Sequence, residues 1–204
     1  MTLLNAESML QLLQSRRSLR RYTSDPVPHE LLVTILESAT WAPSAHNRQP
    51  WRFAVLREFA TRVQLAQAMG NRLRQDLMAD AVPQQIIDED VNRSYERITQ
   101  ASVLIVLCLT MEDMDHYPDD KRAQNERIMA QQSVAMAGQN LLLAAHAVGL
   151  GACWMCAPLF CQDVVQTTLE LPTHWEAQAL ITLGYPAQSR EKQRRPLSEN
   201  VLWR

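Results

Sequence analysis

The sequence predicts an α+β layer fold in a chain of 204 residues. Three observations support this class. About four short apolar segments have the character of strands, amphipathic helical segments lie between them, and the two types do not alternate strictly along the chain. No internal repeat or low-complexity linker divides the sequence, so we expect residues 1–204 to form a single domain.

The helices are predicted from apolar residues at helical spacing and from the prolines that bound them. In the second helix, Leu31, Leu32, Ile35 and Leu36 recur with this spacing, and Pro43 follows its end. The helical segment at 120–148 is rich in Ala and Gly in its second half, which predicts burial nearly all round. The predicted helices cover 7–15, 29–42, 58–81, 83–98, 120–148 and 162–171.

The predicted strands are short apolar segments between these helices. The run at 103–109, VLIVLCL, is apolar on both faces and predicts a strand buried on both sides. The predicted strands cover 51–56, 103–109, the segment from 152 that begins ACWMC, and 177–185. The chain ends in a charged segment followed by Val201, Leu202 and Trp203, and these apolar residues predict docking on a partner.

Composition restricts the function. A net charge of −2 and a pI near 6.2 argue against non-specific binding of nucleic acid or anionic membranes, so any anion site must be local. The first residues lack a signal-peptide pattern and the longest apolar run is too short for a membrane span, so we expect a cytoplasmic protein.

Cysteine and histidine spacing gives weak signals. Cys153 and Cys156 form a C-x-x-C pattern, but in a strand-like segment and not at a helix start where a thiolate is stabilised. Thiol exchange therefore remains a minor alternative. The five histidines are scattered, and none pairs with a cysteine at the spacing of zinc ligands.

Residues 16–21, RRSLRR, concentrate four basic residues near the start of the chain. Helical or turn geometry would group Arg16, Arg17 and Arg20, and Ser18 adds a hydroxyl donor. Guanidinium groups with a hydroxyl suit a phosphate or pyrophosphate. The alternative is a set of solvated cations at a helix C-terminus.

Residues 43–51, PSAHNRQPW, place several hydrogen-bonding side chains in a loop before a strand. Asn47 and Gln49 carry donor and acceptor pairs that suit a planar heterocycle, and Trp51 would shield such a ring or fill the core. A generic polar loop is the alternative.

Residues 149–158, GLGACWMCAP, form a glycine-bounded turn into a strand, where a backbone can approach a ligand closely. The segment does not match the dinucleotide fingerprint, and the sequence has no phosphate loop, nucleophile elbow or H-E-x-x-H motif.

Taken in order, these motifs resemble the FMN-dependent nitroreductase family along essentially the whole chain. The resemblance implies a three-layer fold with a central mixed or antiparallel sheet of four to five strands. It also implies a homodimer with FMN at the subunit interface, the long helix in the dimer seam, and a C-terminal segment that reaches over the partner subunit.

The resemblance also implies roles for individual residues. The FMN phosphate and ribityl chain would be held by Arg16, Arg17, Ser18, Leu19, Arg20 and Arg194. The flavin ring would meet Ser44, Asn47 and Gln49, with the Ser44 loop coming from the other subunit, and the backbone of Trp154, Met155 and Cys156. The family more often has glycine at the position of Cys156.

A closer likeness is to the C-terminal reductase domain of the bifunctional coenzyme F-420 biosynthesis protein. It rests on DLMADAVP at 76–83, HYPD at 116–119, GLGACW at 149–154 and residues 169–185. By this likeness Asp76 and Asp113 would contact substrate, and His46 is a further candidate.

The function expected is an FMN-dependent oxidoreductase that passes two electrons from NAD(P)H, or a deazaflavin, to a small organic acceptor. The alternatives are a reductase of the dehydro precursor of coenzyme F-420 and a non-catalytic flavin- or deazaflavin-binding module. No metal is expected.

Overall fold

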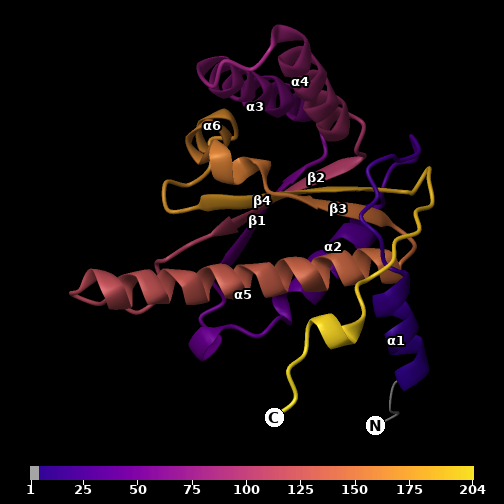
Figure 1. The fold of residues 1–204 in the computed structure, drawn as a ribbon, viewed down its shortest axis with the longest axis vertical. Helices are drawn as coiled ribbons and strands as arrows, with labels where there is room; N and C mark the ends of the chain where they lie inside the picture. Colours follow the sequence, from indigo (N-terminus) through magenta and orange to yellow (C-terminus); the bar gives the residue numbers. More distant parts are fainter. Residues whose placement is uncertain (1–4) are drawn as a thin grey trace.

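A four-stranded antiparallel sheet forms the centre of the computed structural model, which describes residues 5–204 (Figure 1). The strand order is β1-β2-β4-β3, and every pair of neighbours runs antiparallel. The predicted α+β class is confirmed, with the sheet antiparallel rather than mixed. The strands are β1 (Trp51–Leu56), β2 (Val103–Leu109), β3 (Gly151–Met155) and β4 (Glu176–Gly184).

Six α-helices surround the sheet in the described part of the chain. The prediction of each was correct, with ends that differ by a few residues. The sixth was expected to reach Leu171 but ends at Thr168, because Glu170 adopts a left-handed backbone (φ 50°) that stops the helix. The helices are α1 (Ala6–Ser15), α2 (His29–Thr40), α3 (Phe59–Ala79), α4 (Gln84–Thr99), α5 (Asp120–Ala147) and α6 (Gln162–Thr168).

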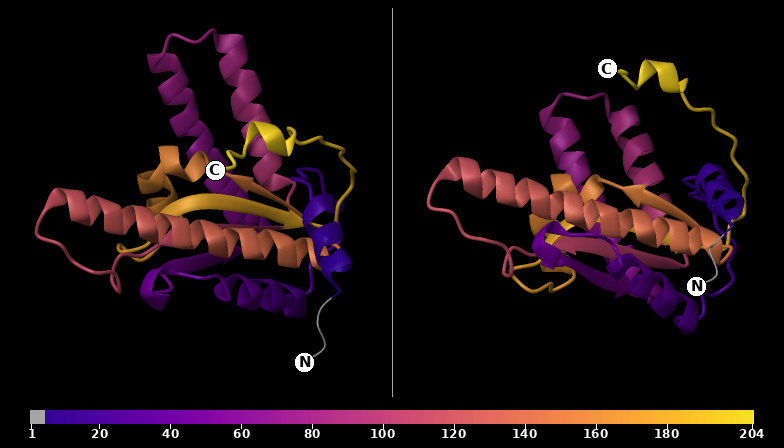
Figure 2. Two further views of the ribbon diagram at one scale, coloured as in Figure 1. Left: turned by 60° about the horizontal axis from the view of Figure 1, so that its bottom comes forward. Right: turned by 90° about the horizontal axis from the view of Figure 1, so that it is seen from below.

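The helices cover both faces of the sheet and produce three layers, as Figure 2 shows. The alternation of side chains along β2 divides its residues between two cores. Val103 and Ile105 pack with α2 and α5, whereas Leu104 and Val106 pack with the α3 and α6 side. All seven residues of β2 are buried, as predicted for a strand covered on both faces.

Helix α5 has one exposed face, so the prediction that its second half is buried nearly all round was wrong for the single chain. Val134, Ala137 and Leu141 are buried toward the sheet, but Ala135 and Met136 are exposed on the other side. This helix belongs to an outer layer, and only one of its faces meets the sheet.

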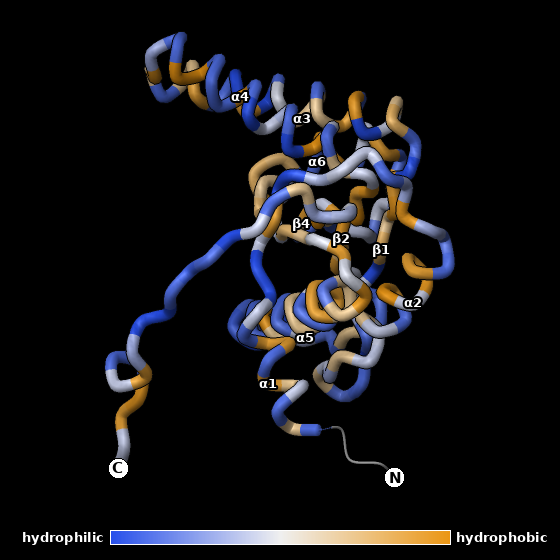
Figure 3. The backbone as a smooth tube through the Cα atoms, turned by 90° about the vertical axis from the view of Figure 1, so that its right-hand side faces the viewer, coloured by the Kyte–Doolittle hydropathy of each residue, from blue (hydrophilic) through white to orange (hydrophobic). Residues whose placement is uncertain are grey.

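The C-terminal segment leaves the sheet after β4 and extends away from the layers (Figure 3). Its last part contains a short 3₁₀ turn at Leu197–Glu199 and three exposed apolar side chains. Leu202 is 74% exposed and Trp203 is 83% exposed, so neither docks against its own chain. Among residues 5–204, no helix is both long and apolar enough to cross a membrane.

Candidate functional site

The arginine segment runs as an extended strand beside the edge strand β3. Ser18 forms a parallel bridge with Ala152, and the Leu19 amide donates to the Ala152 carbonyl at 3.1 Å. The expected helical grouping of the arginines was therefore wrong. In an extended segment, alternate side chains point to the same side, and this periodicity brings Arg16, Ser18 and Arg20 together.

These side chains line a cleft of about 240 Å³ that we call the arginine cleft. The C-terminal segment completes it, and its Arg194 is the residue of that segment that the resemblance assigned to a phosphate. Among the described residues, no member of the cleft is in an ion pair, so its positive charge has no carboxylate partner. The cleft is lined by Arg16, Arg17, Ser18, Arg20, Arg190, Lys192 and Arg194.

Arg17 has an unsatisfied donor in the wall of this cleft. One terminal nitrogen of its guanidinium donates to the carbonyls of Gln14 and Arg16 at 2.5 and 2.9 Å. Its Nε is buried and has no hydrogen-bond partner within the described structure. A buried donor without a partner is costly, and this one belongs to a residue that lines the cleft.

The sequence analysis missed Arg190 and Lys192. The available signal was the alternating spacing of basic residues at 190, 192 and 194, which places them on one side of an extended segment. Tertiary structure was needed to bring this segment to Arg16, because the two come from opposite ends of the chain.

The loop at 43–50 has a strained backbone. His46, Asn47 and Gln49 have φ values of 49°, 54° and 50°, in the left-handed region that favours glycine. The Ser44 hydroxyl accepts a hydrogen bond from the Gln49 amide at 3.0 Å, and the Ala45 amide donates to the Ser133 hydroxyl at 3.3 Å. These contacts hold the loop so that the side chains of His46, Asn47 and Gln49 are exposed.

This loop and the arginine cleft lie at different places along α5. The loop contacts Ser133, whereas His146, thirteen positions later on the helix, lies beside Arg16 and Arg17 in an adjoining cavity. At 1.5 Å per residue these positions are about 20 Å apart. One chain therefore does not bring Ser44, Asn47 and Gln49 to its own arginine cleft.

The strand β3 lies beside the arginine segment, which bridges to Ala152. Trp154 packs toward α5, and Met155 packs on the opposite face of the sheet. Cys156 follows the strand with its side chain exposed, and the Trp154 indole Nε1 donates to its Sγ at 3.1 Å. The strand β3 is an edge strand of the sheet, and Cys156 directly follows its last residue.

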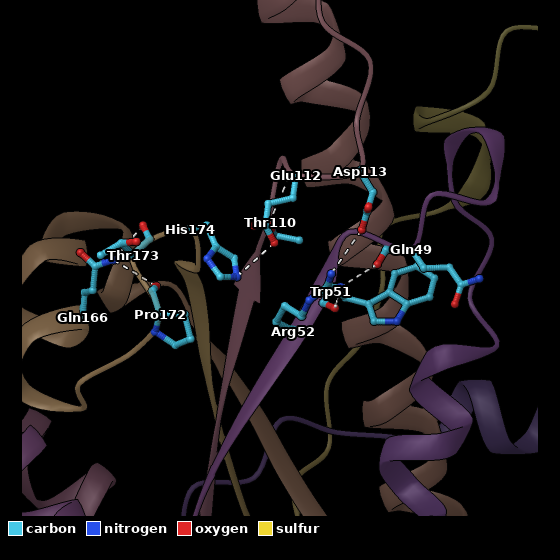
Figure 4. Close-up of polar contacts among 10 residues, drawn as sticks. All are labelled: Gln49, Trp51, Arg52, Thr110, Glu112, Asp113, Gln166, Pro172, Thr173 and His174. Carbon is cyan, nitrogen blue, oxygen red and sulfur yellow. Dashed lines mark hydrogen bonds and ion pairs between the residues drawn. The ribbon is translucent and has the colours of Figure 1, made fainter.

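Asp113 is linked to the loop at 43–50, which we call the amide loop after Asn47 and Gln49, whereas Asp76 is not. Figure 4 shows Arg52 between Gln49 and Asp113: its guanidinium donates to the Gln49 carbonyl at 3.1 Å and pairs with Asp113 at 3.4 Å. The neighbouring Glu112 pairs with His174 at 3.1 Å. Through Arg52, the amide loop is therefore connected to the segment that follows β2 and contains Asp113.

Asp76 is exposed on α3 and lines a separate cavity of about 100 Å³ between α3, α4 and the start of α6. Phe160, which is 77% exposed, lies at the same cavity. The likeness assigned Asp76 and Asp113 to one substrate, but the two residues lie on two different surfaces of the chain.

Burial of the thiols argues against the C-x-x-C alternative. Cys153 is buried, and burial raises the pKa of its thiol, although Arg20 and Arg97 act in the opposite direction. Cys156 is exposed and unpaired. Within residues 5–204, no group of three or more His, Cys, Asp or Glu side chains is arranged to hold a metal ion.

A cavity of about 290 Å³ adjoins the arginine cleft and contains His146. The His146 Nε2 lies 2.8 Å from the Ser15 hydroxyl. Burial, with Arg16 and Arg17 nearby, holds the pKa of His146 below its usual value. The His146 imidazole thus lies next to two of the arginines that line the arginine cleft.

Comparisons with known proteins identify the family of this chain. Residues 13–185 match the family model described as the nitroreductase family. An NADH dehydrogenase from Thermus thermophilus is 35% identical over 93% of this chain and 92% of its own. A 5,6-dimethylbenzimidazole synthase from Rhodospirillum rubrum is 30% identical over 94% and 87%.

Among solved structures, a protein from Desulfovibrio desulfuricans that is assigned as a nitroreductase was determined in complex with FMN. It is 31% identical, with a TM-score of 0.75 over 98% of each chain. A BluB-like flavoprotein from Clostridium difficile has a TM-score of 0.80 over 96% of this chain and 98% of its own, at 21% identity, which supports the fold alone.

Proposed function

Because the chain belongs to the nitroreductase family, we propose that it is an FMN-dependent oxidoreductase in which FMN binds at the arginine cleft. In this proposal the enzyme passes two electrons from a reduced nicotinamide cofactor to a small organic acceptor. Residues 1–204 act as one FMN-binding domain. The single observation that carries the proposal is the arginine cleft, whose cations are in no ion pair within the described residues.

The residues of the cleft fit the phosphate of FMN. Arginine side chains bind phosphate oxygens through charge-assisted hydrogen bonds, and the Ser18 hydroxyl adds a neutral donor. The arginine segment supplies Arg16, Ser18 and Arg20, and the C-terminal segment supplies Arg194. Leu19, whose side chain lies against Gly151, would pack beside the ribityl chain.

Bound FMN would supply the redox chemistry, and the protein would bind, orient and shield it. The backbone of Trp154, Met155 and Cys156 would border the flavin ring, with the Trp154 side chain fixed against α5. The exposed side chain of Cys156 would lie beside the ring. No side-chain nucleophile is needed for this reaction class.

The loop contacts Ser133, which lies about 20 Å along α5 from His146 beside the arginine cleft, and this separation supports a homodimer. In the proposed dimer, Ser44, Asn47 and Gln49 of one subunit would meet the flavin ring held by the arginine cleft of the other. The exposed face of α5 and the exposed Leu202 and Trp203 are the surfaces that such a dimer would cover.

The acceptor would approach the open face of the ring near His46 and Asp113. The loop that contains His46 is linked through Arg52 to Asp113 on the segment after β2, so the two residues would act from one subunit. Asp76 would reach a substrate only from the separate α3 surface. Reduction of a deazaflavin precursor, storage of a flavin or deazaflavin, and a cytoplasmic location stay predictions.

The experiment that tests the proposed function uses purified protein. We expect a yellow protein whose bound flavin is FMN by mass spectrometry and whose visible absorbance is bleached by NADH or NADPH under anaerobic conditions. A protein that binds no flavin would contradict the cofactor assignment. A yellow protein that no nicotinamide or deazaflavin reductant bleaches would instead favour a storage module.

A further inference from the structure

A second cationic cleft lies against α4, next to the arginine cleft. Its volume is about 580 Å³, and we call it the α4 cleft. It lies where the arginine segment and the start of the C-terminal segment meet α4. Its cationic lining consists of Arg20, Arg21, Arg93, Arg97 and Arg190.

The positive charge of the α4 cleft exceeds the negative charge that faces it. The carboxylates in its lining are Glu89 and Glu96, and Glu89 already accepts a hydrogen bond from Gln85 at 3.0 Å. Arg93 pairs with Asp90 on the same helix. Among the described residues, the other four arginines are in no ion pair.

The arginines of the α4 cleft repel one another. Burial lowers the pKa of Arg97, and the nearby charges of Arg20, Arg93 and Arg190 lower it further. Like charges held together without a counter-charge destabilise a fold, and a bound anion offsets this repulsion. The cluster therefore has the electrostatics of an anion site.

The two clefts share Arg20 and Arg190. FMN carries one phosphate group, and the arginine cleft provides enough cations for it without Arg21, Arg93 or Arg97. The α4 cleft is therefore left with donors for a further phosphate placed close to the first. We propose that the α4 cleft binds a second nucleotide phosphate or pyrophosphate group beside the FMN phosphate.

This group has two possible sources with the same chemistry. One is the adenylate half of FAD, if the flavin is longer than FMN. The other is the phosphate groups of the nicotinamide donor. The inference rests on the proposed flavin site for the identity of the first phosphate, but the charge excess of the α4 cleft is independent of it.

The test begins with inorganic pyrophosphate as the probe, titrated calorimetrically into the FMN-loaded protein. The double substitution Arg93→Gln with Arg97→Gln alters only the α4 cleft, because neither residue lines the arginine cleft. We expect the Kd for pyrophosphate to rise at least about tenfold, given the strength of charge-assisted hydrogen bonds. Lys121→Gln, which removes one exposed cation at the far end of α5, is the control and leaves the Kd unchanged.

The conservative variant Arg93→Lys with Arg97→Lys keeps the charge and should recover part of the affinity. Thermal unfolding of each variant verifies that it is folded. A wild-type protein that binds no pyrophosphate, or a Gln variant that binds it as tightly as wild type, would overturn the proposal.

Three nucleotide measurements on the Gln variant then identify the source. A higher Kd for FAD with an unchanged Kd for FMN assigns the α4 cleft to the adenylate half of the flavin. A higher KM for NADPH or NADH with unchanged kcat and FMN affinity assigns it to the donor. If pyrophosphate binding is lost while the affinities for FAD, NADPH and NADH all stay the same, the nucleotide assignment is wrong.

The design separates this proposal from the proposed function. A wild-type protein that takes up no flavin refutes the flavin site, and the pyrophosphate titration on that protein still measures the α4 cleft. Conversely, a normal FMN enzyme whose pyrophosphate affinity does not depend on Arg93 and Arg97 refutes only the second phosphate site.

Discussion

The indole ring of Trp154 occupies the space that a side chain at Gly138 would need. A Cβ added at Gly138 would lie 2.2 Å from Cζ3 of Trp154 and 2.9 Å from a methyl carbon of Leu107. The absence of a side chain in the middle of α5 thus lets β3 place Trp154 against the helix, beside the segment proposed to border the flavin.

The first prediction concerns Gly138→Ala. The added methyl group would displace the Trp154 ring, and such overpacking costs about 1–3 kcal/mol. We expect a lower free energy of unfolding, measured by denaturant titration, and weaker flavin binding.

The matched control is Gly70→Ala in α3. A Cβ there would meet only Val91 at an ordinary 3.4 Å, so the higher helix propensity of alanine should leave stability equal or raise it by up to about 1 kcal/mol. A Gly138→Ala protein as stable as wild type would show that the ring is free to move.

The second prediction tests the arginine cleft through Arg16→Ala combined with Arg20→Ala. Each lost charge-assisted contact is worth about 1.5–3 kcal/mol, so FMN affinity should fall at least about a hundredfold and the protein should purify without colour. Arg57→Ala, at an exposed arginine after β1, is the control and should remain yellow. Full flavin occupancy in the double variant would contradict the assignment.

The third prediction tests whether each site uses two chains. A cleft variant (Arg16→Ala with Arg20→Ala) and a loop variant (Asn47→Ala with Gln49→Ala) should each be inactive alone. If the loop of one subunit serves the cleft of the other, a mixed dimer contains one site with both wild-type halves. Random exchange of subunits should then restore roughly a quarter of the wild-type activity.

Activity and FMN content of the mixture, measured before and after subunit exchange, decide this point. A mixture that never exceeds its parents would mean that the loop and the cleft of the same chain form the site, and the dimer arrangement would have to be abandoned.

The fourth prediction concerns the pH response of His146. Its pKa in the folded chain lies below the unfolded value of about 6.5, chiefly because of burial and also because of Arg16 and Arg17. As pH falls below about 6.5, the unfolded state gains a proton first. Stability should therefore decrease until the folded pKa is passed, and His146→Gln should remove this part of the dependence.

An NMR titration of flavin-free protein measures the pKa directly. Arg16→Gln should raise it, and so should inorganic phosphate, which offsets the charge of the arginines that line the same cavity, Arg190 included. A pKa for His146 at or above the unfolded value would disprove this environment.

The fifth prediction separates the cysteines by burial. Cys156 is exposed, whereas Cys108, Cys153 and Cys161 are buried, and burial raises the pKa of Cys108 to about 12. A thiol reagent at pH 8 should label one cysteine quickly and the others only on unfolding. Cys156→Ser should abolish the fast labelling, and Cys153→Ser should leave turnover unchanged; loss of turnover in the latter would revive thiol exchange.

Local elements were predictable because their causes are local. The strand at Val103–Leu109 was recognised from an apolar run, and the helix at His29–Thr40 from helical spacing. The two errors have different causes, one local and one long-range. Glu170 adopts a left-handed backbone that no proline or glycine announces, and RRSLRR is extended because it pairs with Ala152, a contact far away in the sequence.

By itself, the sequence determined the positions of the strands and of the helices between them, and it placed clusters of basic residues near both ends of the chain. Only the tertiary structure decided that Arg190 and Lys192 join Arg16, and that the loop at 43–50 contacts α5 at Ser133, about 20 Å along the helix from His146 beside the cleft. The physical reason is that periodicity and propensity act over a few residues, whereas a charged cleft depends on which distant segments the sheet pairs side by side.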